Sequence, residues 1–233
     1  MKTKNILLLI LIFLSSCATT RENIQKATAY YKIGLSYFYE NKIQSAFVEF
    51  QKALELNPED KDALNALGLV YLKFEDFQKA RELFIEAVTI DPDFSDAYNN
   101  LGVTYTNMGK WSEAVDSFKK ALKNPLYKTP ENAYYNLGNA YYRLGLIDDA
   151  INAYNDAIKR KQDFHLPYYG LALCYNAKGQ YGDAASAMTR AIELDPVYKG
   201  NKDKTAEDLK EKKLKAKGDE EKDIIDYIEI LKY

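Results

Sequence analysis

Asp96-Ala97-Tyr98-Asn99-Asn100-Leu101-Gly102 opens the stretch that decides the fold, which runs on to Asn124-Pro125-Leu126-Tyr127-Lys128-Thr129-Pro130. Apolar or small residues recur at helical spacing on one face of a first helix: Tyr98, Leu101, Gly102 and Tyr105. After a turn at residues 107–109, a second helical face follows, formed by Ala114, Phe118 and Ala121. The stretch therefore predicts a helix–turn–helix unit that a proline closes.

The same pattern returns on both sides of this unit with a period of 34 residues. Five copies cover residues 27–198, namely 27–60, 61–94, 95–130, 131–164 and 165–198, of which the third is two residues longer. Period and pattern match the tetratricopeptide repeat (TPR). The sequence thus predicts an all-α fold, and the resemblance implies a right-handed superhelical solenoid of about five repeats plus a C-terminal helix.

Small residues in each repeat allow its two helices to approach closely, as Gly102 and Ala114 do in the third. A large residue at the twenty-fourth position of each repeat fills the space beside that contact: Phe50, Phe84, Phe118, Tyr154 and Met188. Each helix pair has too little core to stand alone, so we expect the repeats to stack.

The N-terminus is a separate segment. Lys2 and Lys4 precede nine apolar residues, Ile6 to Leu14, and Cys17 follows after two serines. The apolar run is far shorter than the roughly 20 residues that a membrane span needs. It predicts a lipoprotein signal peptide over residues 1–16, a lipid-modified Cys17 and a polar tether to residue 26. An ordinary secretory signal with an incidental cysteine is the alternative. Ala18 after the cysteine favours outer-membrane sorting, on the periplasmic side of a bacterial envelope.

The C-terminal segment follows the last repeat. Residues 199–222 alternate lysine with acidic residues, which suits a solvated helix or a disordered linker. Residues 223–233 predict an amphipathic helix. Three readings of it stay open: a cap on repeat five, a detached docking helix for a partner, or a degenerate sixth repeat.

The sequence contains no recognisable catalytic constellation. His165 is the only histidine, Cys174 reads as a core residue, and phosphate loops, zinc spacings and nucleophile elbows are missing. A net charge of −2 gives no basis for nucleic-acid binding. We therefore predict a protein that is not an enzyme, with no cofactor, no metal and no small-molecule substrate.

A TPR stack offers a concave groove lined by its first helices. The residues expected to bind a protein partner there are Tyr31, Phe38, Asn65, Asn99, Tyr135, Asn139, Tyr142 and Tyr169. This aromatic, amide-rich lining suits a peptide or a partner helix. With only Lys73 and Arg143 as basic groove residues, it does not suit the carboxylate clamps that hold chaperone tails. Trp111 is read as a packing residue.

One feature narrows the family. The third repeat ends in Asn124-Pro125-Leu126-Tyr127 with Thr129-Pro130, before a repeat that contains Ala133 and Asn136-Leu137-Gly138. This resembles the PilF/PilW/Tgl family of type IV pilus biogenesis and stability lipoproteins. The resemblance implies a pilotin, which binds a secretin subunit and aids its localisation and assembly in the outer membrane. The alternative is a TPR lipoprotein scaffold for peptidoglycan enzymes (NlpI-like) or outer-membrane protein assembly (BamD-like).

The long end of the third repeat should displace repeat four and reshape the groove. We expect the partner site near this junction, with Asn99, Tyr135 and Asn139 facing it.

Overall fold

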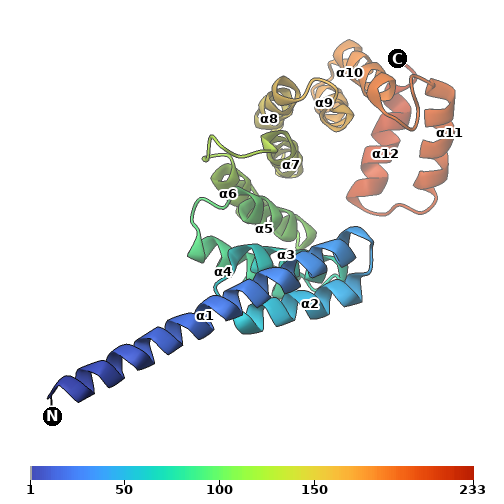
Figure 1. Cartoon of the computed structure of the whole chain (residues 1–233). Coiled ribbons are helices and arrows are strands. Elements are labelled where there is room, and N and C mark those ends of the chain that lie inside the picture. The colour runs from blue at the N-terminus through green and yellow to red at the C-terminus, as the bar shows by residue number, and fades with distance from the viewer. Residues whose placement is uncertain (1) are drawn as a thin grey trace. The chain divides into compact units, whose positions relative to one another are not determined.

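A computed structural model describes the backbone of residues 2–233 and the side chains of residues 21–233. Over that backbone the chain forms twelve helices and no strand (Figure 1), so the predicted all-α fold is confirmed. The side chains of Cys17 and of the predicted signal peptide lie outside the described part of the chain, and lipidation stays a prediction. Within the described part of the chain, no helix combines the length and apolarity that crossing a bilayer requires.

Each predicted repeat contains two helices in sequence order. Their bounds are α1 Lys2–Tyr39, α2 Ile43–Leu56, α3 Lys61–Lys73, α4 Phe77–Ile90, α5 Ser95–Asn107, α6 Trp111–Ala121, α7 Pro130–Arg143, α8 Ile147–Arg160, α9 His165–Ala177 and α10 Tyr181–Leu194. Two more helices follow the last repeat, α11 Lys202–Lys213 and α12 Asp219–Ile230. Residues 21–26, predicted as a tether, are part of α1, where Lys26 pairs with Glu22 one turn earlier at 2.7 Å.

The turn between the two helices of a repeat needs one residue in the left-handed region. Gly109, Gly145 and Gly179 supply it in repeats three to five, with φ between 70° and 74°. Asn41 and Glu75 occupy the same place in the first two repeats, each with φ 58°. A residue with a Cβ costs more there than glycine, but a single turn position tolerates it.

The helices fall into two compact units, residues 1–104 and 105–233. In the first unit, the rings and methyl groups of α2 and α3 form a buried cluster: Ala46, Phe50, Ala66, Leu67 and Val70. The fully buried Phe50 ring lies against Gly34, where an added Cβ would come within 2.6 Å of it. Glycine at the eighth repeat position is therefore a packing requirement, as the sequence pattern predicts.

In the second unit, Tyr154 of α8 takes the place that phenylalanine holds in the first three repeats. Its ring lies between Gly138 of α7 and Gly170 of α9, whose hypothetical Cβ atoms would come within 2.6 Å and 2.3 Å of it. The two glycines let three helices meet around one buried ring. The buried cluster around Tyr154 extends through α9 and α10 into the C-terminal helices.

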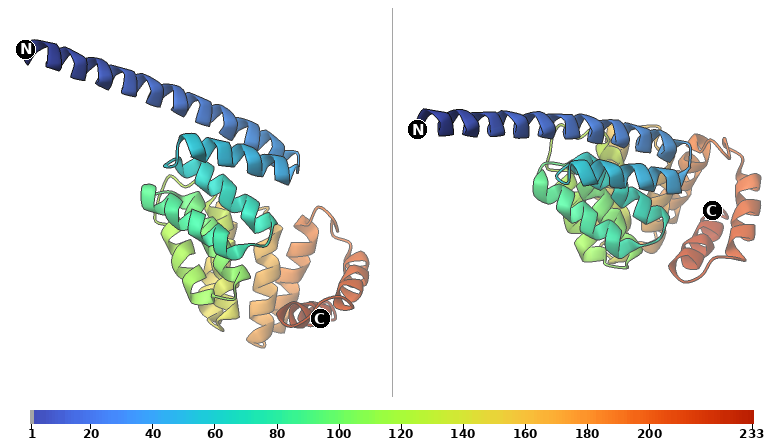
Figure 2. Two further views of the ribbon diagram at one scale, coloured as in Figure 1. Left: turned by 90° about the horizontal axis from the view of Figure 1, so that it is seen from below. Right: turned by 60° about the horizontal axis from the view of Figure 1, so that its bottom comes forward.

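The C-terminal helices pack on repeat five. Leu209 of α11 and Ile224 and Ile230 of α12 belong to the same core cluster as Met188 and Ile192 of α10. Figure 2 shows α12, in dark red, beside α9 and α10, with α11 next to α12. The segment therefore covers the edge of repeat five and is not a detached helix, and this packing fits both a cap and a degenerate sixth repeat.

The cap also extends further than its apolar pattern suggests. Helix α12 begins at Asp219, four residues before the predicted start, because Gly218 turns the chain with φ 62° just ahead of it. Asp219, Glu220 and Glu221 then place negative charge at the helix N-terminus, where the macrodipole favours it.

The lengthened junction after repeat three is an ordered turn. The Asn124 side chain accepts a hydrogen bond from the Leu126 backbone amide at 2.9 Å, and Pro130 begins α7. Tyr127 is buried, whereas Leu126 is 84% exposed. Tyr127, the aromatic residue of the junction, therefore contributes to internal packing.

Candidate functional site

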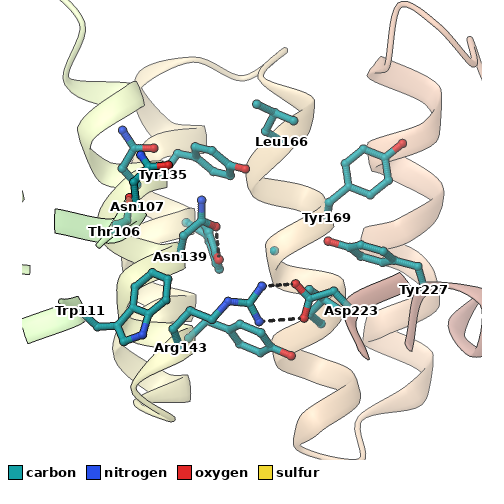
Figure 3. A pocket seen from close by; sticks show the side chains of 15 residues that line it. Thr106, Asn107, Trp111, Tyr135, Asn139, Arg143, Leu166, Tyr169, Asp223 and Tyr227 are labelled. Atoms are coloured by element: carbon teal, nitrogen blue, oxygen red, sulfur yellow. Dashed lines mark hydrogen bonds and ion pairs between the residues drawn. The ribbon is translucent and has the colours of Figure 1, made fainter. Parts of the chain in front are cut away.

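A pocket of about 340 Å³ opens on the inner side of the second unit (Figure 3). It is lined by the ends of α5 and α6, by one face of α7 and α9, by Tyr154 and by α12. The lining residues are Thr106, Asn107, Trp111, Tyr135, Asn136, Asn139, Tyr142, Arg143, Tyr154, Leu166, Tyr169, Gly170, Leu173, Asp223 and Tyr227. Four of the eight predicted groove residues, Tyr135, Asn139, Tyr142 and Tyr169, therefore meet in one place.

Helix α7 contributes the main wall. Tyr135, Asn139, Tyr142 and Arg143 follow one another at the spacing that keeps side chains on one helical face. The Tyr135 ring packs against Phe164, with centroids 5.6 Å apart, and against Tyr154 at 6.2 Å. Burial, and to a smaller extent Asp223, raises the pKa of Tyr142, so its hydroxyl is neutral at physiological pH.

The Asn139 amide is fixed from behind. Its Oδ1 accepts a hydrogen bond from the Tyr154 hydroxyl at 2.7 Å, visible as a dashed line in Figure 3. Burial raises the pKa of Tyr154 well above its usual value, which keeps this hydroxyl protonated and a donor. A phenylalanine at this position, as in the first three repeats, would leave the asparagine oxygen without that donor.

Helix α9 forms the opposite wall. Tyr169 donates a hydrogen bond to Asp195 at 3.1 Å, which orients its ring, and burial raises its pKa. Leu166 at the start of the helix is partly exposed at the rim of the pocket, and Leu173 is buried. Gly170 between them leaves space for the Tyr154 ring.

Helix α12 closes the pocket. The Arg143 guanidinium donates from Nη1 to Asp223 Oδ1 at 3.0 Å and from Nη2 to Asp223 Oδ2, a two-pronged ion pair (Figure 3). One turn later, the Tyr227 ring stands edge-on to Tyr169, with centroids 5.7 Å apart and an interplanar angle of 73°. Burial is the largest single effect on Arg143 and lowers its pKa, but the hydrogen bond to Asp223 and the attraction of the Asp223 and Asp219 charges together outweigh it, so the net pKa is raised.

Asp223 and Tyr227 are site residues that sequence reasoning missed. They lie four residues apart on α12, beside its apolar residues, so the helical pattern alone assigns them to one face. The pattern does not indicate that this face of α12 points into the pocket formed by α7 and α9. The groove position of Arg143, one of only two basic residues in the predicted lining, was the available clue.

Trp111, which the sequence predicts to be a packing residue, lines the pocket beside Thr106 and Asn107. The ring stands at the first residue of α6, where the chain leaves its turn and the side chain can reach the pocket. It adds a large, partly exposed aromatic surface to the site.

The other predicted groove residues lie in the first unit and do not join this pocket. Tyr31 and Phe38 pack against the core cluster around Phe50. Burial, aided by Asp62, raises the pKa of Tyr31 to about 12. Asn65 accepts a hydrogen bond from Asn100 Nδ2 at 2.9 Å. Asn99 is half-buried on α5 and is absent from the pocket lining.

The lengthened junction also does not line the pocket. The part of the site nearest to it in sequence is Trp111 on one side and Tyr135 on the other. The expected partner site at this junction stays a prediction, although of the three residues expected to face it only Tyr135 and Asn139 line this pocket. These residues set the start of α7 through Pro130 and act on the site only through that helix.

The chemistry of the pocket is that of a binding surface. Its lining offers aromatic rings, amides and one internally paired ion pair. Over residues 21–233 no cluster of three or more histidine, cysteine, aspartate or glutamate side chains could hold a metal ion. Such a lining fits contact with a polypeptide, whose backbone needs hydrogen-bonding groups and whose side chains need apolar area.

Comparison with known proteins agrees with this architecture. One model of the tetratricopeptide repeat matches residues 31–95 and 135–198. A second model of the same repeat matches residues 95–124. No curated protein matches the sequence significantly.

Solved structures share the fold. The type IV pilus biogenesis factor PilW is 24% identical, with a TM-score of 0.68 over 72% of this chain and 77% of PilW. MamA is 27% identical, with a TM-score of 0.63 over 73% of this chain and 92% of its own. PilF of Pseudomonas aeruginosa is 20% identical, with a TM-score of 0.68 over 86% and 97% of the two chains. Since one repeat model alone covers more than half of the sequence, the chain belongs to the tetratricopeptide repeat family.

Proposed function

We propose that this protein is an outer-membrane lipoprotein adaptor of type IV pilus biogenesis, which binds a secretin subunit and promotes its localisation and assembly. The observation that carries the adaptor role is the concave pocket of α7, α9 and α12, with its aromatic and amide lining. TPR proteins bind protein partners, and this surface offers contact area without reactive groups.

Two further observations support the pilus role. PilW, which shares the fold, is described as a type IV pilus biogenesis factor. PilF of Pseudomonas aeruginosa shares the fold as well. The Asn124–Pro130 stretch, which generic repeat packing does not require, resembles the pilus lipoprotein family. A lipid on Cys17 would confine the adaptor to a membrane surface and raise its effective concentration near a membrane-bound partner.

Gene deletion tests the proposal. Outer-membrane fractions of the deletion strain should lose the detergent-resistant secretin multimers that the parent strain contains, and the wild-type gene should restore them. A Cys17→Ser gene should give folded protein that fails to restore multimers at native expression levels. Unchanged multimers in the deletion strain would refute the secretin role.

A matched pair of substitutions separates the pocket from the rest of the surface. Leu166 lines the rim of the pocket and is 36% exposed, whereas Leu146 lies outside the pocket and is 45% exposed. Both stand at the start of a helix. Leu166→Glu should reduce secretin co-purification, while Leu146→Glu should leave it at the wild-type level. Equal binding by both variants would place the partner elsewhere.

A further inference from the structure

We infer that the pocket selects uncharged protein segments. The chain's own Asp223 forms an ion pair with Arg143, and this arginine would otherwise attract acidic segments. This inference rests on the proposed role of the pocket as a protein-binding site. It assigns to α12 a part in specificity beyond covering the edge of repeat five.

The charges of the pocket support this inference. Of the fifteen lining residues, all of which the structure describes, Arg143 is the one cation and Asp223 the one carboxylate. The tyrosines add no charge, because burial raises the pKa of Tyr135, Tyr142 and Tyr169 above the ordinary value. The charges of the lining residues therefore sum to zero.

The geometry of the ion pair shows that Asp223 binds both terminal nitrogens of Arg143. Both terminal nitrogens of Arg143 donate to the two carboxylate oxygens, as in the strongest class of charge-assisted hydrogen bonds. The side chains of Arg143 and Asp223 are only 22% and 15% exposed, so water screens the pair weakly. A partner carboxylate could form the same two-pronged contact with Arg143 only by displacing Asp223.

Displacement is unfavourable because Asp223 is held in place by its own helix. Ile224 and Ile230 anchor α12 in the core and are 5% and 1% exposed. The Asp223 carboxylate therefore has an effective concentration at Arg143 on the order of millimolar or above. An acidic partner segment at cellular concentration cannot match it.

The position of Arg143 argues against a purely structural explanation. Covering the apolar edge of repeat five requires contacts with α9 and α10, which Ile224 and Ile230 already provide. Arg143 belongs to repeat four and stands at the end of α7, at a position that faces the groove. The ion pair thus links α12 to the binding surface itself.

The rest of the pocket lining, apart from the Arg143–Asp223 pair, indicates which kind of segment fits the pocket. Trp111, Tyr135 and Leu166 offer apolar area, and the Asn139 amide, held by the Tyr154 hydroxyl, adds a polar group to the lining. A volume of about 340 Å³ is at the lower end for small ligand sites and accommodates a short piece of chain. The fitting occupant is an extended, uncharged segment with a large aromatic or aliphatic side chain.

Selection from a random peptide library displayed on phage tests the inference, with the full-length protein as bait in four forms. Wild-type protein should enrich uncharged peptides that contain aromatic or large aliphatic residues. Asp223→Asn frees Arg143 and should enrich acidic peptides, with about tenfold or greater preference for a selected peptide over its amide-substituted form. This preference should weaken as salt concentration rises.

Two further variants serve as controls. Arg143→Gln leaves Asp223 unpaired and should shift the selection towards basic peptides. The double variant Arg143→Gln with Asp223→Asn keeps an uncharged, hydrogen-bonding pair and should select like wild type. Circular dichroism melts confirm that each bait is folded, and the single variants give opposite outcomes that general damage cannot mimic.

Three outcomes would overturn the inference. They are acidic peptides selected by the wild type, an Asp223→Asn selection that matches wild type, and no enrichment on the wild type at all. These outcomes are independent of the pilus assay. A loss of secretin multimers can coincide with any peptide selection, so failure of the pilus proposal and failure of this inference are distinguishable.

Discussion

At the residue scale, the chain relies on small residues that make room for one large side chain. Tyr154 is the clearest case, because its ring needs the missing Cβ atoms of Gly138 and Gly170 while its hydroxyl reaches Asn139 in the pocket. The same residue therefore fixes the packing of three helices and the orientation of a binding-surface amide. Glycine at 138 was predictable from the repeat pattern, whereas the role of Gly170 was not, because its position is not part of that pattern.

Replacing Gly138 by alanine should destabilise the protein. The added Cβ would meet ring carbons of Tyr154 at 2.6 Å, so the ring or a helix must shift. We expect a net loss of about 1–3 kcal/mol in the free energy of unfolding, since overpacking outweighs the better helix propensity of alanine. Urea denaturation followed by circular dichroism measures it.

Gly182→Ala is the matched control for this substitution. Gly182 also lies in a helix, but nothing lies within 4 Å of its hypothetical Cβ. This variant should be as stable as the parent or up to about 1 kcal/mol more stable. If both variants lost stability equally, close packing against Tyr154 would not be the cause.

Tyr154→Phe tests the other role of this residue. The ring stays in place, but Asn139 Oδ1 loses the donor at 2.7 Å. We expect a cost of about 0.5–1.5 kcal/mol in the free energy of unfolding. Secretin or library-peptide affinity should fall as well, because the amide is no longer held in one orientation. Phe118→Tyr, the reverse exchange in repeat three, should not reproduce the affinity change, since Phe118 does not line the pocket.

At the element scale, the helices of the repeats were predictable and the destination of the last helix was not. The 34-residue period and its small residues require helix pairs, because only that arrangement buries Phe50, Phe84 and Phe118 together with the alanines. The amphipathic pattern of residues 223–233 predicts a helix equally well. It contains no information on which surface that helix covers, so the ion pair between residues eighty positions apart could not be predicted.

Truncating one anchor of α12 measures how firmly the cap is held. Ile230 is 1% exposed and Ile225, on the same helix, is 38% exposed. Ile230→Ala should cost about 2–5 kcal/mol through lost burial and a residual cavity. Ile225→Ala should cost far less, because its side chain already contacts water. Hydrogen exchange of α12 amides would show the difference directly, and equal exchange rates in both variants would contradict the packing described.

At the scale of the whole molecule, stability should be local. Repeat proteins gain stability chiefly between neighbouring helices, so one part can open while another stays folded. The two compact units, residues 1–104 and 105–233, have separate core clusters around Phe50 and around Tyr154. The sequence predicted the stack of repeats, but its one irregularity in repeat length lies at the end of the third repeat, so a division within α5 could not be expected from it.

Thiol labelling of Cys174 can measure local opening of the second unit. Its thiol is fully buried in the second unit, and burial raises its pKa to about 12. Only about one thiol in ten thousand is then ionised at pH 8, so labelling by a thiol reagent requires opening. In a Cys17→Ser background, Cys174 should label slowly in native buffer and fast in urea.

Destabilising substitutions then locate the opening unit. Ile230→Ala lies in the core cluster that contains Cys174 and should speed the labelling. Phe50→Ala lies in the first unit and should change it much less. Equal acceleration by both variants would mean that the chain unfolds as a single cooperative body.

The ion pair between Arg143 and Asp223 also has an evolutionary consequence. Two residues that neutralise each other inside a binding surface cannot drift independently, since each single change exposes a charge to the partner. Descendant sequences should therefore keep both, lose both, or exchange the two charges. A lineage that retains the arginine but has lost the carboxylate should have acquired a different partner, with an acidic segment in the corresponding place.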